Sequence, residues 1–179
     1  YSESEIRDAI KGEEGITFSK CEIDGVVDLL MDQNIISVFK GGSESGRRAL
    51  GNRSIIADPR SIEMKDKVNL RVKHRQWFRP FAPSILRENV VDWFEEDVES
   101  PYMSMVANMK PEMASKVAAV AHQNGSARLQ TVTRESNAAF YDLLKKWEAK
   151  SGVPILLNTS FNDREPICET PSHAIKCFM

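Results

Sequence analysis

Cysteine is scarce in this chain, and its few copies are poorly spaced for a disulfide or a metal site. Cys21, Cys168 and Cys177 are the three cysteines among 179 residues, and no CxxC pair occurs. A disulfide framework and a cysteine-based zinc site are therefore not expected. The three histidines also lack metal-ligand spacing, so we predict no protein-bound metal in this chain. A reducing compartment, the cytoplasm, fits this cysteine usage best.

Long apolar runs and several common catalytic motifs are also missing. No run of about 18 apolar residues occurs, so no transmembrane helix is expected. The first eight residues are polar and acidic, which excludes a secretory signal peptide in the chain as given. The sequence has no Walker A loop, no HExxH zinc motif, no GxSxG nucleophile motif and no EF-hand loop. These absences exclude the commonest sequence signatures of nucleotide, zinc, serine-hydrolase and calcium sites.

Positive charge is concentrated in one segment. Residues 40–90 contain twelve Lys and Arg against five Asp and Glu, although the whole chain has a net charge of −2. Residues 1–39 are acidic, with three basic residues against nine acidic ones. A local basic segment in a near-neutral chain indicates a local anionic ligand, whereas a solvated basic face is the simpler alternative.

Hydrophobic spacing and turn residues predict a chain of alternating helices and strands. The predicted helices are residues 2–10, 24–32, 58 to about 73, 137–150 and from 172 onward. The predicted strands are residues 35–39, 54–57, 82–86, 102–107, 127–132 and 153–157. Such a mixture indicates an α/β or α+β fold, with a twisted mixed sheet and flanking helices.

Two segments combine cations with residues that shape the backbone. Residues 41–54 place glycines beside three arginines between two predicted strands, and this combination suits an anion. Residues 71–84 interleave four cations with Trp77, Phe78 and Phe81. We expect these aromatic residues to pack into the core, whereas Arg79, held between apolar residues and Pro80, is not expected to be an ordinary surface residue.

Two later segments add polar groups at strand ends. Residues 122–132 contain Arg128 on a predicted strand, which alone is a weak signal. Residues 156–162 form an apolar strand that ends in Asn158, Thr159, Ser160 and Asn162. Ligands of open α/β sheets bind beyond the carboxyl ends of strands, so these amides and hydroxyls are candidate ligand groups; a polar turn is the alternative.

Taken in order, these segments resemble the C-terminal region of the carbamoyltransferase family, which includes nodulation-factor and antibiotic O-carbamoyltransferases. The resemblance covers about residues 35–179. The matching strings are RALGNRSI at 48–55, ADPR at 57–60, FRPFAP at 78–83, ARLQTV at 127–132 and LLNTSFN at 156–162.

The resemblance implies a YrdC-like fold, related to threonylcarbamoyl-adenylate synthases. It implies a domain that takes carbamoyl phosphate and ATP, with ATP-bound Mg²⁺, and forms carbamoyl-adenylate and pyrophosphate. A separate N-terminal ASKHA-type domain, which holds iron or another metal, would pass the carbamoyl group to the acceptor. Residues 1–22 would then be a linker from that domain, and residues 23–179 the C-terminal domain, cut short at its own end.

The resemblance also assigns roles to individual residues. Lys73, Arg79 and Arg128 are the expected catalytic residues. The expected nucleotide- and substrate-binding residues are Arg48, Asn52, Arg53, Ser84, His122, Asn158 and Ser160. We expect no membrane partner, and the acidic flanks and a sequence pI of about 6.0 argue against an RNA-binding module.

Two segments depart from the family pattern, and one of them, at 122–126, reads HQNGS where the family commonly has HVDGT and so lacks an aspartate. Arg47 stands where the family usually has proline, and residues 42–46 lack an arginine and two apolar residues that the family often has there. A non-catalytic, regulatory module that binds a nucleotide or another anion is therefore the alternative to an adenylate-forming domain.

Overall fold

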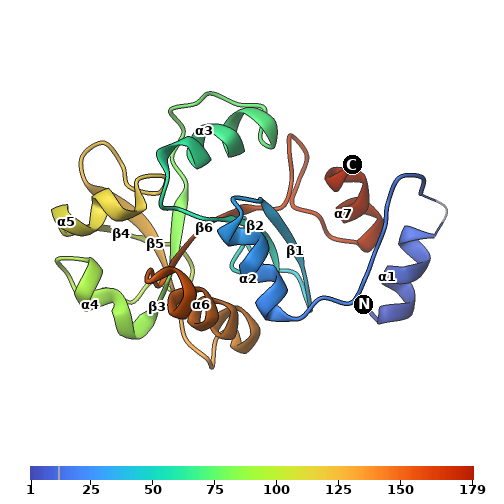
Figure 1. Ribbon diagram of the computed structural model, residues 1–179, viewed down its shortest axis with the longest axis horizontal. Coiled ribbons are helices and arrows are strands. Elements are labelled where there is room, and N and C mark those ends of the chain that lie inside the picture. The colour runs from blue at the N-terminus through green and yellow to red at the C-terminus, as the bar shows by residue number, and fades with distance from the viewer. Residues whose placement is uncertain (12) are drawn as a thin grey trace.

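Six strands form one open mixed sheet in a computed structural model, which describes residues 1–11 and 13–179 (Figure 1). The strands are β1 (Ile36–Phe39), β2 (Arg53–Ala57), β3 (Ala82–Leu86), β4 (Met105–Asn108), β5 (Ser126–Val132) and β6 (Ile155–Ser160). Their order across the sheet is β1-β2-β6-β3-β5-β4. Strands β3 and β5 run parallel, and the other neighbouring pairs run antiparallel. The predicted mixed sheet is confirmed, whereas the YrdC-like assignment stays a prediction.

Helices flank this sheet in the described part of the chain. The α-helices are α1 (Glu3–Ile10), α2 (Ile23–Met31), α3 (Ile62–Arg71), α4 (Val90–Trp93), α5 (Pro111–Ala114), α6 (Ala138–Ser151) and α7 (Pro171–Phe178). Short 3₁₀ helices are η1 (Arg87–Asn89) and η2 (Ser115–Val117). None of the helices in the described ranges is long and apolar enough to cross a lipid bilayer.

Alternate residues of the central strands face two separate apolar cores. On β6, Ile155 and Leu157 pack in the cluster that includes residues of α3 and α4, whereas Leu156 packs in the cluster that includes residues of α2 and α6. This two-residue period is that of a strand buried on both faces. It explains why the apolar run at 153–157 shows no alternation with polar residues.

Helix α6 has the ends that its sequence predicts. The side chain of Asn137 accepts a hydrogen bond from the backbone N–H of Phe140 and caps the first turn. Gly152 ends the helix in the left-handed conformation, with a φ of 75°. Trp147 is fully buried and donates its indole N–H to the carbonyl of Ile155, which fixes the helix against β6.

The prediction that Asp58 and Pro59 start a helix is wrong. Helix α3 begins at Ile62, and Ser61 is its N-cap residue. The carboxylate of Asp58 is fully buried and accepts hydrogen bonds from Arg60 and from the side chain of Gln33. Because these partners occupy the carboxylate, it does not cap a helix.

Two other strand and turn predictions differ in detail. Strand β4 begins at Met105, three residues later than the predicted strand at 102–107, because Met103 has a positive φ of 55°. The predicted turn at Asn124–Gly125 is confirmed, since Gly125 has a φ of 79°.

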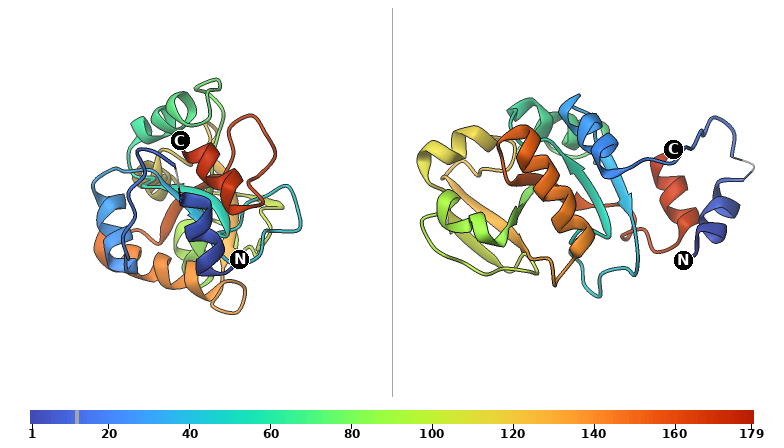
Figure 2. Two further views of the ribbon diagram at one scale, coloured as in Figure 1. Left: turned by 90° about the vertical axis from the view of Figure 1, so that its right-hand side faces the viewer. Right: turned by 60° about the horizontal axis from the view of Figure 1, so that its bottom comes forward.

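Helices α1 and α7 pack together at one end of the protein, next to β1 (Figure 2). The first residue also contributes, because the ring of Tyr1 lies 5.8 Å from that of Phe39 on β1. The capping box predicted for Ser2 and Glu5 is present at the start of α1. The N-terminal segment therefore contacts the folded chain.

Candidate functional site

A cavity of about 740 Å³ opens where β6 ends and where β3 and β5 begin. Segments from the whole length of the chain form its wall, namely the loop between β1 and β2, the segment after α3, β5, and the end of β6. The lining residues are Arg47, Arg48, Ala49, Lys73, His74, Arg75, Arg79, Pro80, Phe81, Ala82, Met103, Val106, His122, Arg128, Asn158, Thr159, Ser160, Asn162, Asp163 and Arg164. The carboxyl end of β6 thus faces the cavity, as the sequence predicts for a ligand site.

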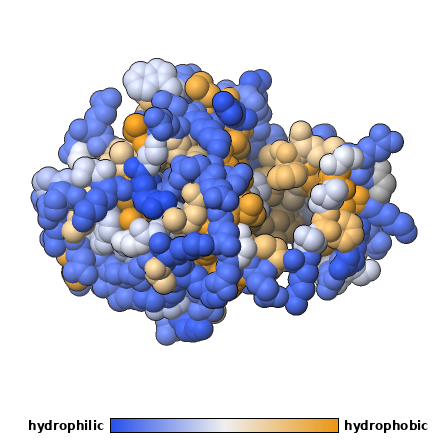
Figure 3. Space-filling view, viewed as in Figure 1, coloured by the Kyte–Doolittle hydropathy of each residue, from blue (hydrophilic) through white to orange (hydrophobic). Residues whose placement is uncertain are grey.

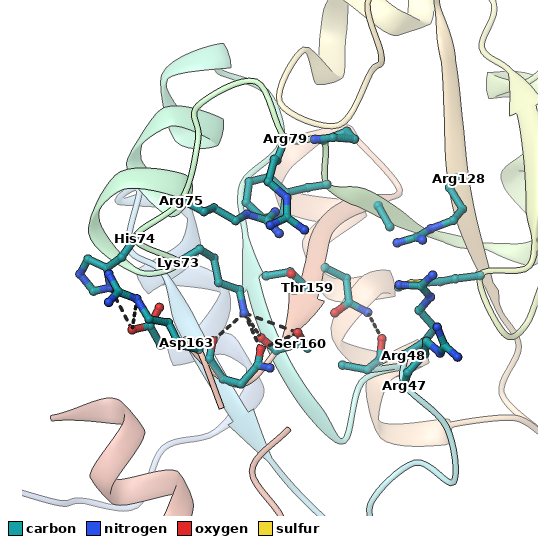
Figure 4. A pocket seen from close by; sticks show the side chains of 18 of the residues that line it. Arg47, Arg48, Lys73, His74, Arg75, Arg79, Arg128, Thr159, Ser160 and Asp163 are labelled. Carbon is teal, nitrogen blue, oxygen red and sulfur yellow. Dashed lines mark hydrogen bonds and ion pairs between the residues drawn. The ribbon is translucent and has the colours of Figure 1, made fainter. Parts of the chain in front are cut away.

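Positive charge dominates this wall. Seven lining residues are Lys or Arg, and among the described lining residues Asp163 is the one carboxylate. Figure 4 shows Lys73, Arg75 and Arg79 on one side and Arg47, Arg48 and Arg128 on the opposite side. Such an arrangement repels itself unless an anion lies between the two sides.

The pKa values of three cavity groups record this repulsion. Burial and the neighbouring Arg79 lower the pKa of Arg75 to about 10. Burial and Arg48 lower the pKa of Arg128, and burial and Arg128 lower the pKa of His122. Each shift favours loss of a proton, so each group gains stability from an added negative charge.

Arg128 and Asn158 also contain polar atoms without partners. The Nε atom of Arg128 and the Oδ1 atom of Asn158 are buried and make no hydrogen bond within the described part of the chain. Both residues line the cavity, and Arg128 forms no ion pair in the described residues. Buried polar atoms almost always have partners, so these two atoms mark a place for a ligand or an ordered water.

A buried hydrogen-bond network supports the floor of the cavity. The amide Nδ2 of Asn158 donates to the carbonyl of Ala49 at 3.2 Å, to Ser84 Oγ at 2.9 Å and to Gln130 Oε1 at 3.0 Å. Gln130 Nε2 in turn donates to the carbonyl of Leu50 at 2.9 Å. The network joins β3, β5 and β6 to the loop that carries Arg47 and Arg48. Ser84 itself lies beneath the cavity and does not line it.

Hydrogen bonds within the loop between β1 and β2 fix its conformation. The carboxylate of Glu44 accepts hydrogen bonds from the backbone N–H groups of Leu50 and Asn52 at 2.7 and 2.8 Å. Gly51 has a φ of +113°, and a Cβ there would lie 2.6 Å from the ring of Phe140, so this turn requires glycine. The departure from the family pattern at 42–47 therefore lies in a loop with its own fixed shape.

Asn52 and Arg53 hold this loop and do not line the cavity. Arg53 is fully buried, and its guanidinium donates to the carbonyls of Lys40 and Gly41 and lies 3.7 Å from the centre of the Phe39 ring. Asn52 donates to the carbonyl of Gly42 and accepts from the side chain of Asn137.

Lys73 lies deep in the wall, with 5% of its surface exposed. Its ammonium group donates to the carbonyl of Ser160 at 2.6 Å, and to the carbonyl and Oδ1 of Asn162 at 2.6 and 2.8 Å (Figure 4). Burial and the nearby charge of Arg75 lower the pKa of Lys73 to about 8. Lys73 thus ties the segment after α3 to the end of β6.

Asn69 is a functional candidate that the sequence reading missed. It is fully buried on α3, and its Nδ2 donates to the carbonyls of Trp77 and Arg79 at 3.1 and 3.0 Å. Its Oδ1 accepts from Arg75 Nε at 2.7 Å. All of these partners belong to one cavity-lining segment. The sequence signal that could have identified Asn69 is an amide residue on the apolar side of a short helix.

The aromatic residues of this segment do not all pack inside. Phe81 is in the core, but Trp77 and Phe78 are exposed, so the prediction that they pack inside is wrong. They contact each other edge to face, with ring centres 6.0 Å apart. Arg79 is also exposed, at the wall of the cavity, while its backbone carbonyl accepts a hydrogen bond from Asn69.

The structure therefore brings seven of the ten predicted site residues to one cavity: Arg48, Lys73, Arg79, His122, Arg128, Asn158 and Ser160. Asn52, Arg53 and Ser84 lie behind its wall. Arg75 and Arg164 line the cavity and were not predicted. Arg75 was within the basic segment, and its stacking on the Phe81 ring at 4.7 Å could not be read from spacing.

Comparison with known proteins identifies the family of this chain. A family model described as "Carbamoyltransferase C-terminus" matches residues 27–179. The nodulation protein NolO of Bradyrhizobium diazoefficiens is 43% identical over 85% of this chain and 28% of its own length. NolNO of Sinorhizobium fredii is 44% identical over 84% of this chain and 23% of its own length. Nodulation protein U of Rhizobium tropici is 42% identical over 79% of this chain and 24% of its own length.

The chain spans about a quarter of the length of these curated relatives. The family match includes all six strands of the sheet and every residue of the cavity wall. Its coverage agrees with the resemblance seen in the sequence motifs. The chain thus belongs to the carbamoyltransferase C-terminus family.

Proposed function

We propose that this chain is the adenylate-forming part of an O-carbamoyltransferase. It binds ATP and carbamoyl phosphate in the cationic cavity and forms carbamoyl-adenylate for transfer by a separate domain. The observation that carries this proposal is the cavity itself, in which Arg48, Arg79 and Arg128 face one another with no ion-pair partner in the described residues. Two phosphorylated substrates supply the negative charge that such a wall requires.

The proposed reaction has two steps, a hydrolysis and a nucleotidyl transfer. Water cleaves carbamoyl phosphate to carbamate and phosphate, and a carbamate oxygen then attacks the α-phosphorus of ATP. The new oxygen–phosphorus bond gives carbamoyl-adenylate, and pyrophosphate leaves with the electron pair of the bond that breaks. Charge grows on the leaving phosphates, so fixed cations beside them lower the barrier.

The residues of the wall divide naturally between these tasks. Arg79 and Arg128 lie on opposite sides of the cavity and would hold the phosphates of the two substrates together (Figure 4). Arg48 adds charge beside Arg128, and Asn158 and Ser160 offer neutral hydrogen bonds from β6. Mg²⁺ would enter on ATP, since the described wall offers one carboxylate, Asp163, which is too few to hold the ion without the phosphates.

Release of pyrophosphate that depends on carbamoyl phosphate tests this function. We expect Arg128→Ala and Arg79→Ala to lower its rate by about 10²–10³, the usual loss for one charge-stabilising donor. Arg134→Ala is the matched control, because Arg134 is exposed and pairs with Asp142. An unchanged rate in both cavity variants would contradict the proposal.

A non-catalytic module is the second candidate function. The ammonium group of Lys73 donates its hydrogen bonds to Ser160 and Asn162. This bonding is more typical of a structural cation than of a mobile group that binds phosphate. In that case, calorimetry would show ATP binding that Arg128→Ala weakens, but no pyrophosphate would appear. ATP binding that persists as the salt concentration rises would also distinguish this module from an RNA-binding protein.

The acceptor site is proposed to lie elsewhere in the whole protein. The curated relatives are about four times as long as this chain, which leaves room for the N-terminal ASKHA-type domain and its metal. The cytoplasm, where ATP is made and thiols stay reduced, is the compartment that we propose.

A further inference from the structure

Two cysteines and a glutamate meet outside the cationic cavity. One carboxylate oxygen of Glu165 and the Sγ atoms of Cys168 and Cys177 all lie within 4.8 Å of one another. Glu165 and Cys168 follow β6, whereas Cys177 lies on α7. The three side chains border a second cavity, of about 800 Å³, and Figure 3 shows a hollow with hydrophobic walls between α7 and the sheet.

The carboxylate of Glu165 is held in place before any ligand arrives. Its two oxygens accept hydrogen bonds from the backbone N–H groups of Asp163 at 3.0 Å and Arg164 at 3.2 Å. These bonds, with that of Asp163 the strongest, lower the pKa of Glu165 to about 2. A carboxylate that is ionised and oriented by neighbouring donors has the support typical of a metal ligand.

The two thiols have few other partners. Cys168 is 2% exposed and packs with Phe161 and Ala174, and its Sγ makes only a long 3.6 Å contact with the carbonyl of His173. Burial and the hydrogen bond with Glu165 raise the pKa of Cys177 to about 12. Without a cation, the pair thus stays protonated beside a carboxylate.

We propose that Glu165, Cys168 and Cys177 bind one thiophilic divalent cation, with Zn²⁺ as the natural candidate and a water molecule as its fourth ligand. Two thiolates and one carboxylate are a ligand set that zinc accepts. In a tetrahedral zinc site with Zn–S bonds of about 2.3 Å, the sulfurs lie about 3.8 Å apart, within the observed limit. Binding displaces both thiol protons to solvent, and the bound set has a net charge of −1.

The remaining negative charge has a neighbour of opposite sign. Lys73 lies on the other side of the same segment and interacts favourably with Cys177 and Glu165. Asn162, which accepts from Lys73, also donates to the carbonyl of Glu165 at 2.7 Å. A bound cation would thus fix α7 to the segment that positions Lys73. The proposal itself does not depend on the reaction in the cationic cavity.

Cadmium is the probe for this site, because Cd²⁺–thiolate bonds absorb in the ultraviolet. We expect the purified full-length protein to bind one more Cd²⁺ per chain than its Cys177→Ser variant, with a thiolate charge-transfer band that the variant lacks. Cys21→Ser is the matched control, because Cys21 is exposed and does not belong to this cluster. It should bind as the parent protein does.

A second variant keeps the test decisive if loss of a cysteine disturbs folding. Glu165→Gln should weaken Cd²⁺ binding by about tenfold or more, the loss that even an outer partner of a metal site brings. Circular dichroism of each variant verifies its fold. Equal cadmium content and equal absorption in the parent, Cys177→Ser and Glu165→Gln proteins would overturn the proposal.

Discussion

Lys73 is the cavity cation whose charge is most sensitive to pH. It is buried beside Arg75, and both effects favour its neutral form, so its pKa falls from 10.5 to about 8. Arg75, with a pKa of about 10, stays charged at pH 8. Between these two values, the cavity loses one positive charge while its other cations remain.

We therefore predict that affinity for ATP falls as pH rises through about 8. The protonated form of Lys73 attracts phosphate, and deprotonation removes that attraction. The affinity for ATP therefore falls, and does not rise, throughout this pH range. Calorimetric titration with Mg²⁺-bound ATP from about pH 7 to about 9 measures it, since the bound cation keeps the terminal phosphate ionised across this range. Lys73→Met should bind more weakly at pH 7 and show no such decline. A decline of equal size in Lys73→Met would assign the titration to another group.

Arginine illustrates how far residue roles can be predicted from this sequence. Arg53 and Arg128 both occur in basic, motif-rich segments, and both were assigned to the ligand. Arg53 is satisfied by the carbonyls of Lys40 and Gly41, whereas Arg128 Nε has no partner in the described residues. An arginine in the sequence predicts a positive charge. Whether that charge is bonded within the protein, as in Arg53, or is left for a ligand, as in Arg128, depends on which segments the fold brings beside it.

At the scale of elements, Asn69 connects a helix to the loop that it positions. Its side chain binds the backbone of the Trp77–Arg79 turn and the side chain of Arg75. It does not line the cavity, so it acts through these cations. We class it as a positioning residue.

We predict that Asn69→Ala weakens ATP binding by about tenfold and lowers the free energy of unfolding by about 1–3 kcal/mol, because it leaves buried groups without partners. Calorimetry and urea unfolding measure the two effects separately. Asn89→Ala is the control, because the Asn89 amide bonds Glu148 away from the cavity. It should lower stability but leave ATP binding unchanged. If both variants bind ATP normally, Asn69 is only a core residue.

Elements with strong local signals are those that the sequence predicts well. Helix α6 and the neighbouring β6 follow from a capping residue, an apolar stripe and a terminal glycine. The start of α3 does not follow from local signals, because the carboxylate of Asp58 accepts hydrogen bonds from Arg60 and from Gln33, which is 25 residues away. Likewise, the carbonyls of Trp77 and Arg79 are bonded to Asn69, a contact that the local sequence does not indicate. Long-range hydrogen bonds override local preference at these places.

At the scale of the whole molecule, several segments of this chain form the wall of the cationic cavity, whereas we propose that the acceptor site lies in the rest of the protein. We predict that purified residues 1–179 bind ATP, seen as a rise in melting temperature, yet transfer no carbamoyl group to any alcohol. Mass spectrometry of a mixture with sugars, ATP and carbamoyl phosphate detects any transfer. A carbamoylated sugar would show that the acceptor site belongs to this chain.

The position of β6 in the sheet sets the order in which this protein can assemble during synthesis. β6 lies between β2 and β3, yet it is the last strand in the sequence, at Ile155–Ser160. Until it leaves the ribosome, the β1–β2 hairpin and the β3–β5–β4 group have no strand to join them, and each exposes an unpaired edge. Nascent chains from which β6 has not yet left the ribosome should thus be clients for chaperones. The cationic cavity, whose wall includes Asn158, Thr159 and Ser160, is complete only after that last strand has been inserted.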